Sequence, residues 1–203
     1  MSNALDLEEY DLEGPSLGYA NPARLGSEFN LMLKITCPFN GFTAEVRERQ
    51  LSRMGDYDLQ PRTAEPRCGE VMQDIPGTAQ GNWWYAGQTV VQTAWNRQLA
   101  LVHDNVDPSL AAISIGGIVT GTGVWLFRPE SSGRINRDFS DVTADGQTYC
   151  YHGAMTDDSS QTKTPFPGRL LVALNSDTEM LVERQDGGCA DGAAFVDPVT
   201  YRR

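Results

Sequence analysis

Residues 98–127, QLALVHDNVDPSLAAISIGGIVTGTGVWLF, decide the fold class of this chain. Three stretches rich in apolar and β-branched residues, Gln98–His103, Ala111–Ile115 and Ile118–Phe127, alternate with turn-forming residues. The first gap holds Asp, Asn and Pro, and the second is the pair Gly116-Gly117. Paired glycines tolerate the positive φ of tight hairpin turns, so the pattern predicts three antiparallel strands in a meander.

The flanking sequence continues this pattern of short strands. A hairpin turn is predicted at Asn96-Arg97, and a second at Asn175-Ser176-Asp177, between two strongly apolar stretches. Longer polar loops are predicted at 128–146 and 157–167, and Gly187-Gly188-Cys189 is expected to end the pairing. The remaining predicted strands are Phe29–Ile35, Trp83–Tyr85, Thr89–Thr93, Gln147–Tyr151, Arg169–Leu174 and Glu179–Glu183.

The predicted fold class is all-β. About eight to ten short strands at regular spacing are typical of an antiparallel β-barrel or a β-sandwich. The short sequential connections of the meander favour the barrel, with the sandwich as the alternative. At most one short helix is expected, over Thr43–Met54, where Thr43 is a possible N-cap and Gly55 a stop. We expect one β-rich domain over residues 15–203.

The ends and the charge narrow the possible classes of protein. Met1-Ser2-Asn3-Ala4 resembles a cloning remnant, and the stretch Leu5–Gly14 holds five acids and no base, so residues 1–14 are expected to be a disordered acidic arm. The chain has 16 basic and 27 acidic residues, a net charge of −11. No nucleic-acid partner is expected, because a phosphate backbone repels this field. No stretch predicts a membrane span.

The four cysteines predict disulfides and export. Cys37, Cys68, Cys150 and Cys189 are widely spaced and form no C-x-x-C pair. We favour the pairing Cys37–Cys68 with Cys150–Cys189, because each bridge then closes a moderate loop within one half of the chain. Disulfides persist in oxidising compartments, so the predicted location is secreted or periplasmic. Four buried thiols in a cytoplasmic protein are the alternative.

The aromatic residues indicate the leading functional hypothesis, a non-catalytic module that binds a small apolar or sugar-like ligand. Trp83, Trp84, Trp95 and Trp125 are the candidate ligand-binding residues, since aromatic rings stack on sugars and line apolar cavities. The alternative, that they fill the core or anchor an interface, is favoured because aromatic residues dominate protein cores. The sequence Gly81-Asn82-Trp83, followed by a meander, resembles the G-x-W start of lipocalin-type barrels, and that resemblance implies a cup for a small hydrophobic molecule.

Two further hypotheses come from other residue types. A hydrolase or isomerase on the same scaffold would use His103, Asp104 and His152, although no known catalytic spacing surrounds them. Asp104 and Asp107 are candidate calcium ligands, but they lack the usual calcium-loop pattern, and no metal or cofactor is expected. The third hypothesis is a structural or protein-interaction module with an exposed sheet face.

Overall fold

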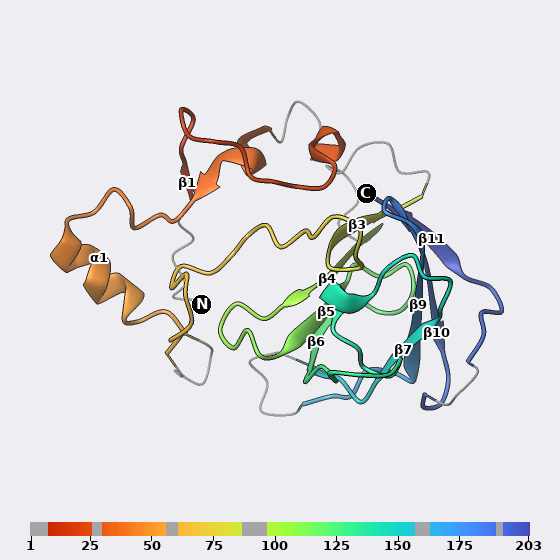
Figure 1. Ribbon diagram of the computed structural model, residues 1–203. Helices are drawn as coiled ribbons and strands as arrows, with labels where there is room; N and C mark the ends of the chain where they lie inside the picture. The colour runs from red at the N-terminus through yellow and green to blue at the C-terminus, as the bar shows by residue number, and fades with distance from the viewer. Residues whose placement is uncertain (1–7, 26–29, 56–60, 87–96, 157–162, 190–192) are drawn as a thin grey trace.

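The computed structural model describes residues 8–25, 30–55, 61–86, 97–156, 163–189 and 193–203 (Figure 1). Within these residues, nine strands form one antiparallel sheet in the order β7-β9-β10-β11-β3-β4-β5-β6-β8. Their bounds are β3 (Gly81–Tyr85), β4 (Gln98–His103), β5 (Ala111–Ile115), β6 (Gly123–Phe127), β7 (Tyr149–His152), β8 (Met155–Thr156), β9 (Arg169–Ser176), β10 (Glu179–Gln185) and β11 (Val199–Arg202). The all-β prediction is confirmed.

The sheet curls into a half-barrel. Its edge strands, β7 and β8, follow each other in the chain with only Gly153-Ala154 between them. Consecutive Cα atoms are about 3.8 Å apart, so this connection spans at most about 11 Å and brings the two edges of the sheet close together. In Figure 1 the yellow strand β3 and the green strands β4–β6 form one wall, and the blue strands β9–β11 form the wall that faces it.

Alternating side chains fill the concave side of the sheet. In β4, for example, Leu99 and Leu101 are buried and their neighbours are less so. One end of the core is covered by the 3-10 helix η4 (Phe139–Asp141), whose buried Phe139 ring contacts Phe127 and Tyr151 edge-on or tilted. The predicted polar loop 128–146 therefore supplies part of the core.

The strand predictions are accurate within the meander and less so at its turns. β4 and β5 have the predicted bounds. The prediction of a tight turn at Gly116-Gly117 is wrong. Ile115 pairs with Gly123, and the whole stretch between these two residues is loop. In the β9–β10 hairpin the turn is Asp177-Thr178, which begins two residues after the start of the predicted turn Asn175-Ser176-Asp177 and has a register shift beside it. Predicted strand Thr89–Thr93 and most of the Asn96-Arg97 turn lie outside the described residues.

Strand β11 was not predicted, yet it joins the two walls of the half-barrel. Tyr201 and Arg202 pair with Tyr85 and Trp84 of β3, and the other side of β11 pairs with β10. This strand follows Gly187-Gly188-Cys189, so the expectation that pairing ends there was wrong.

The edge of β7 that does not pair with β9 is covered by a loop. Backbone hydrogen bonds join Cys150 to Arg134 and Asn136, with N···O distances of 2.9 Å. The Asn136 side chain also binds the backbone of His152, accepting from its N–H at 3.0 Å and donating to its carbonyl at 3.1 Å. The Cys150–Cys189 disulfide ties the segment after β10 to the same strand. This edge is therefore not open for further pairing.

The N-terminal residues form a separate layer, which we call the N-terminal lobe (residues 8–72). Figure 1 shows its red and orange segments to one side of the sheet. The predicted strand Phe29–Ile35 is wrong: the described part is the 3-10 helix η2 (Asn30–Lys34), followed by the short strand β2 (Ile35–Thr36). The remaining elements of the lobe are β1 (Glu9–Tyr10), which pairs with β2, the 3-10 helix η1 (Pro22–Leu25) and the α-helix α1 (Ala44–Leu51).

The lobe is fastened to the sheet through Asp74 and Trp84. The Asp74 carboxylate accepts hydrogen bonds from the backbone N–H of Ala20 at 2.9 Å and of Asn82 at 2.8 Å, so it links the lobe to β3. Trp84 faces away from the core that holds Trp83, and packs against Tyr19, Met32 and Leu33 of the lobe. Successive residues of a strand point to opposite faces, which gives these two tryptophans different partners.

Candidate functional site

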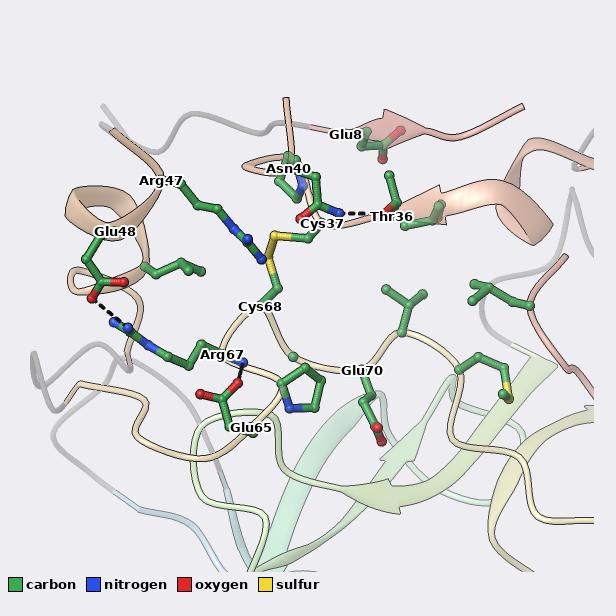
Figure 2. Close-up of a pocket in the computed structure, with 18 of the residues that line it drawn as sticks. Glu8, Thr36, Cys37, Asn40, Arg47, Glu48, Glu65, Arg67, Cys68 and Glu70 are labelled. Carbon is green, nitrogen blue, oxygen red and sulfur yellow. Dashed lines mark hydrogen bonds and ion pairs between the residues drawn. A yellow bond between two sulfur atoms is a disulfide. The ribbon is translucent and has the colours of Figure 1, made fainter. Parts of the chain in front are cut away.

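The N-terminal lobe contains a pocket of about 1020 Å³ (Figure 2). This volume lies at the upper end of the usual range for small-molecule sites. Three stretches form its walls: β2 with the residues that follow it, helix α1, and the extended stretch 65–72. The pocket therefore lies outside the concave side of the half-barrel.

The Cys37–Cys68 disulfide joins two of these walls. Cys37 follows β2 and Cys68 belongs to the stretch 65–72, and both cysteines line the pocket. This bridge and Cys150–Cys189 are the pairing that the sequence analysis favours. Cys37 and Cys68 are 31 residues apart in the chain, and the covalent bond between them limits how far these two walls can separate.

One end of the pocket is charged. Arg67 donates from its guanidinium to the Glu48 carboxylate at 2.7 Å, and its backbone N–H donates to the Glu65 carboxylate at 3.1 Å. The Arg47 side chain extends from α1 toward the disulfide in Figure 2. Among the described residues, no ion pair or hydrogen bond engages its guanidinium.

The pocket lining also contains apolar side chains. Leu17, Ile35, Val71 and Met72 contribute aliphatic and thioether groups to its lining. Val71 is 52% exposed, so its surface is available to a ligand. Thr36 and Asn40 also line the pocket and hydrogen-bond each other at 3.0 Å. The pocket can thus hold a molecule with an apolar body and a polar or charged group.

The tryptophans predicted to bind a ligand have packing roles where the structure describes them. Trp83, Trp84 and Trp125 are 0%, 4% and 6% exposed, and none of them lines the pocket of the N-terminal lobe. The Trp83 indole N–H donates to the Ala79 carbonyl at 2.9 Å, and the Trp125 ring meets Phe166 edge-on. Trp95 lies outside the described residues, so its role stays a prediction.

His103 has a structural environment. Its Nδ1 faces the Pro108 carbonyl at 2.7 Å and its Nε2 faces the Asp138 carboxylate at 3.2 Å, so both ring nitrogens are engaged within the protein. Burial acts to raise the pKa of Asp138, but hydrogen bonds from the Ser140 hydroxyl and amide, together with His103, outweigh it and lower this pKa.

The neighbouring acids form turns. Asp104 accepts hydrogen bonds from the backbone N–H groups of Val106 at 3.0 Å and of Asp107 at 2.6 Å. Asp107 accepts from the Ser109 hydroxyl at 2.6 Å, which is the usual local role of Asp in a turn. No group of three potential metal ligands was found in the part of the chain that the structure describes. Calcium binding by Asp104 and Asp107 stays a prediction.

His152 lies apart from His103, at a second pocket of about 520 Å³ lined also by Glu130, Arg134 and Asn136. Neither His103 nor Asp104 lines this pocket. Of the three residues of the enzyme hypothesis, His152 alone lines this pocket.

Comparisons with protein-family models, with curated proteins and with solved structures found no match. No helix in the described ranges is both long and apolar enough to cross a membrane.

The main pocket was not predicted because its walls come from three distant stretches and contain no aromatic side chain. One signal in the sequence pointed to it. The favoured disulfide places the residues around Cys37 beside those around Cys68, and the predicted helix lies between them in the chain. Arg47, Val71 and Met72 could have been identified as neighbours on that basis.

Proposed function

We propose that this protein is an exported, non-catalytic binding module that holds a small ligand with an apolar body in the pocket of the N-terminal lobe. The observation that carries the proposal is the pocket itself, about 1020 Å³ in volume, whose lining combines apolar side chains with six charged ones. Small-molecule sites likewise combine apolar walls with placed polar groups.

In this proposal the half-barrel is the scaffold. Its aromatic cluster packs the core, and Asp74 and Trp84 hold the lobe against its outer face. The Cys37–Cys68 bridge keeps the walls of the pocket together before a ligand arrives, which lowers the entropy cost of binding.

The two disulfides and the acidic charge support the remaining parts of the proposal. Disulfides are compatible with an extracellular location, where they persist. A net charge of −11 disfavours nucleic acid as the partner.

The test uses N-phenyl-1-naphthylamine, an uncharged apolar dye whose fluorescence rises in apolar sites. The oxidised wild-type protein is expected to bind it saturably. The variant Val71→Asp should weaken binding by about tenfold or more, because a carboxylate replaces an apolar wall. The matched control is Val196→Asp, since Val196 is 84% exposed and lies outside the pocket.

Absence of saturable dye binding would overturn the proposal, and so would equal weakening by both variants. A second outcome would also overturn the proposal: dye binding that is unchanged in Val71→Asp and that quenches tryptophan fluorescence. The dye would then bind at the aromatic cluster. Circular dichroism of each variant checks that the fold is retained.

A further inference from the structure

We infer that the ligand of the N-terminal pocket is an amphiphile with an acidic head group, a carboxylate bound by Arg47, and an apolar tail that lies along Val71 and Met72. The inference rests on the proposed function and adds the chemical class of the ligand. It also assigns a binding role to Arg47, a residue of helix α1.

Helix α1 presents one complete face to the pocket. Its four lining residues are Ala44, Arg47, Glu48 and Leu51, at positions i, i+3, i+4 and i+7. Residues with this spacing lie on one side of an α-helix. Arg47 is therefore held toward the pocket by the register of the helix, whereas Arg49 of the same helix is not among the lining residues.

The other charged side chains around the pocket have partners within the protein or point elsewhere. Glu48 forms the ion pair with Arg67 at 2.7 Å, and Glu65 accepts the Arg67 backbone N–H. The Glu8 carboxylate accepts a hydrogen bond from the Tyr10 hydroxyl. In Figure 2 the Glu70 side chain points away from the disulfide and from Arg47. Among the described lining residues, Arg47 is the charged group that remains available to a ligand.

The chemistry of arginine selects the head group. A guanidinium presents paired N–H donors in a planar fork that matches the two oxygens of a carboxylate. The overall charge of −11 opposes an anion, but charges farther than about 8 Å are largely screened at physiological salt. Four carboxylates also line the pocket, those of Glu8, Glu48, Glu65 and Glu70. The Glu48 charge is offset by its ion pair with Arg67. The bidentate contact of the head group with Arg47 therefore has to outweigh these nearby acids as well.

The arrangement of the pocket orients the molecule. Arg47 lies at the α1 wall beside the disulfide, and Cys68 lies next to it (Figure 2). The stretch Cys68–Met72 leads from the disulfide along the pocket, and its residues Val71 and Met72 belong to the lining. A head group at Arg47 thus places an extended tail along Val71 and Met72.

The experiment compares two probes of equal chain length, dodecanoate and dodecyltrimethylammonium, each below its micelle-forming concentration. Both are titrated as competitors of N-phenyl-1-naphthylamine bound to the full-length oxidised protein. Wild-type protein is expected to prefer dodecanoate. Arg47→Gln should lower the dodecanoate affinity by about tenfold more than the dye affinity, because only dodecanoate carries a charge that the guanidinium binds.

The matched control is Arg49→Gln, which makes the same change in net charge on the same helix outside the pocket. It is expected to leave all three affinities unchanged. Equal loss of dodecanoate binding in both variants would overturn the inference, because the effect would then be a general one of charge. Tighter binding of dodecyltrimethylammonium to wild-type protein would overturn it as well.

The two proposals fail in different ways. If the wild-type protein does not bind the dye, the pocket is not an apolar site and the proposed function fails. If the dye binds and depends on Val71, but dodecanoate binding does not depend on Arg47, only the carboxylate assignment fails.

Discussion

The guanidinium of Arg203 lies over the indole ring of Trp83, 4.4 Å from its centroid. Both side chains are buried, Arg203 with 3% of its surface exposed. A guanidinium at this distance from a tryptophan face makes a cation–π interaction, which is stronger when it is desolvated. Its N–H groups also donate to four backbone carbonyls, those of Ile75, Thr78, Gln80 and Asp177. One side chain thus ties the end of β11 to the loop before β3 and to the β9–β10 turn.

Replacing Arg203 should therefore destabilise the half-barrel. We expect Arg203→Gln to lower the free energy of unfolding by about 3 kcal/mol, because several buried carbonyls lose a charged donor. The neighbouring Arg202→Gln is the control, since Arg202 forms an exposed pair with Glu179 worth about 1 kcal/mol or less. Urea unfolding followed by tryptophan fluorescence measures both, and equal losses would contradict the assignment.

Replacing Asn136 with alanine is expected to destabilise the fold more than replacing it with glycine. Its φ is 50°, in the left-handed region that glycine adopts without strain, and its side chain makes both hydrogen bonds to the His152 backbone. Asn136→Gly loses the hydrogen bonds only, at a cost of about 1–2 kcal/mol, whereas Asn136→Ala adds roughly 1 kcal/mol of backbone strain. Thermal unfolding of the two variants shows which one is less stable. An alanine variant more stable than the glycine variant would refute the explanation.

The two disulfides should have separable effects. They close segments of 31 and 39 residues, so chain-entropy arguments give each a contribution of roughly 4 kcal/mol. Removing Cys150–Cys189 with paired alanines should lower the unfolding midpoint of the half-barrel. Removing Cys37–Cys68 should mainly weaken dye binding, because that bridge joins the pocket walls. Tryptophan-monitored unfolding and dye titration of both double variants test this, and a reversed pattern would count against the assigned roles.

Acid should destabilise the protein partly through Asp138. The folded-state pKa of its carboxyl lies below the ordinary value of 3.8, so this group stabilises the fold above that pH. The contribution is lost as the pH falls through the folded-state pKa and the carboxylate is protonated. Urea unfolding between about pH 5 and pH 2 should show a shallower loss of stability for Asp138→Asn than for wild type.

The control for this pH series is Asp141→Asn, whose carboxylate forms a more exposed ion pair with Arg137. Parallel pH dependences for wild type and Asp138→Asn would mean that other carboxylates carry the acid sensitivity.

The meander was predictable because its signals are local. Alternation in Gln98–His103 and the apolar stretch Ala111–Ile115 specify strands without knowledge of their partners. β11 was missed for the opposite reason: Val199–Arg202 is a strand because β3 and β10 lie on either side of it. Such non-local pairing leaves little trace in four residues of sequence.

The site was harder to predict than the fold. Tryptophan density pointed to Trp83, Trp84 and Trp125, but large rings fill cores as readily as they bind ligands, and the structure buries all three. The pocket depends on how β2, α1 and the stretch 65–72 meet, and only the disulfide pairing carried that information. Arg47 differs from Arg49 only in helical register relative to the pocket, which no local pattern specifies.

The pairing of β3 with β11 has a consequence for the order of events during synthesis. β3 is the first strand of the large sheet to leave the ribosome and β11 the last, yet they are neighbours within it. Until β11 emerges, one edge of β3 lacks its partner and the two walls are not joined. Unpaired strand edges promote aggregation in partly folded chains. The nascent chain therefore depends on its final strand, and folding of the half-barrel is expected to be completed only after translation of that strand.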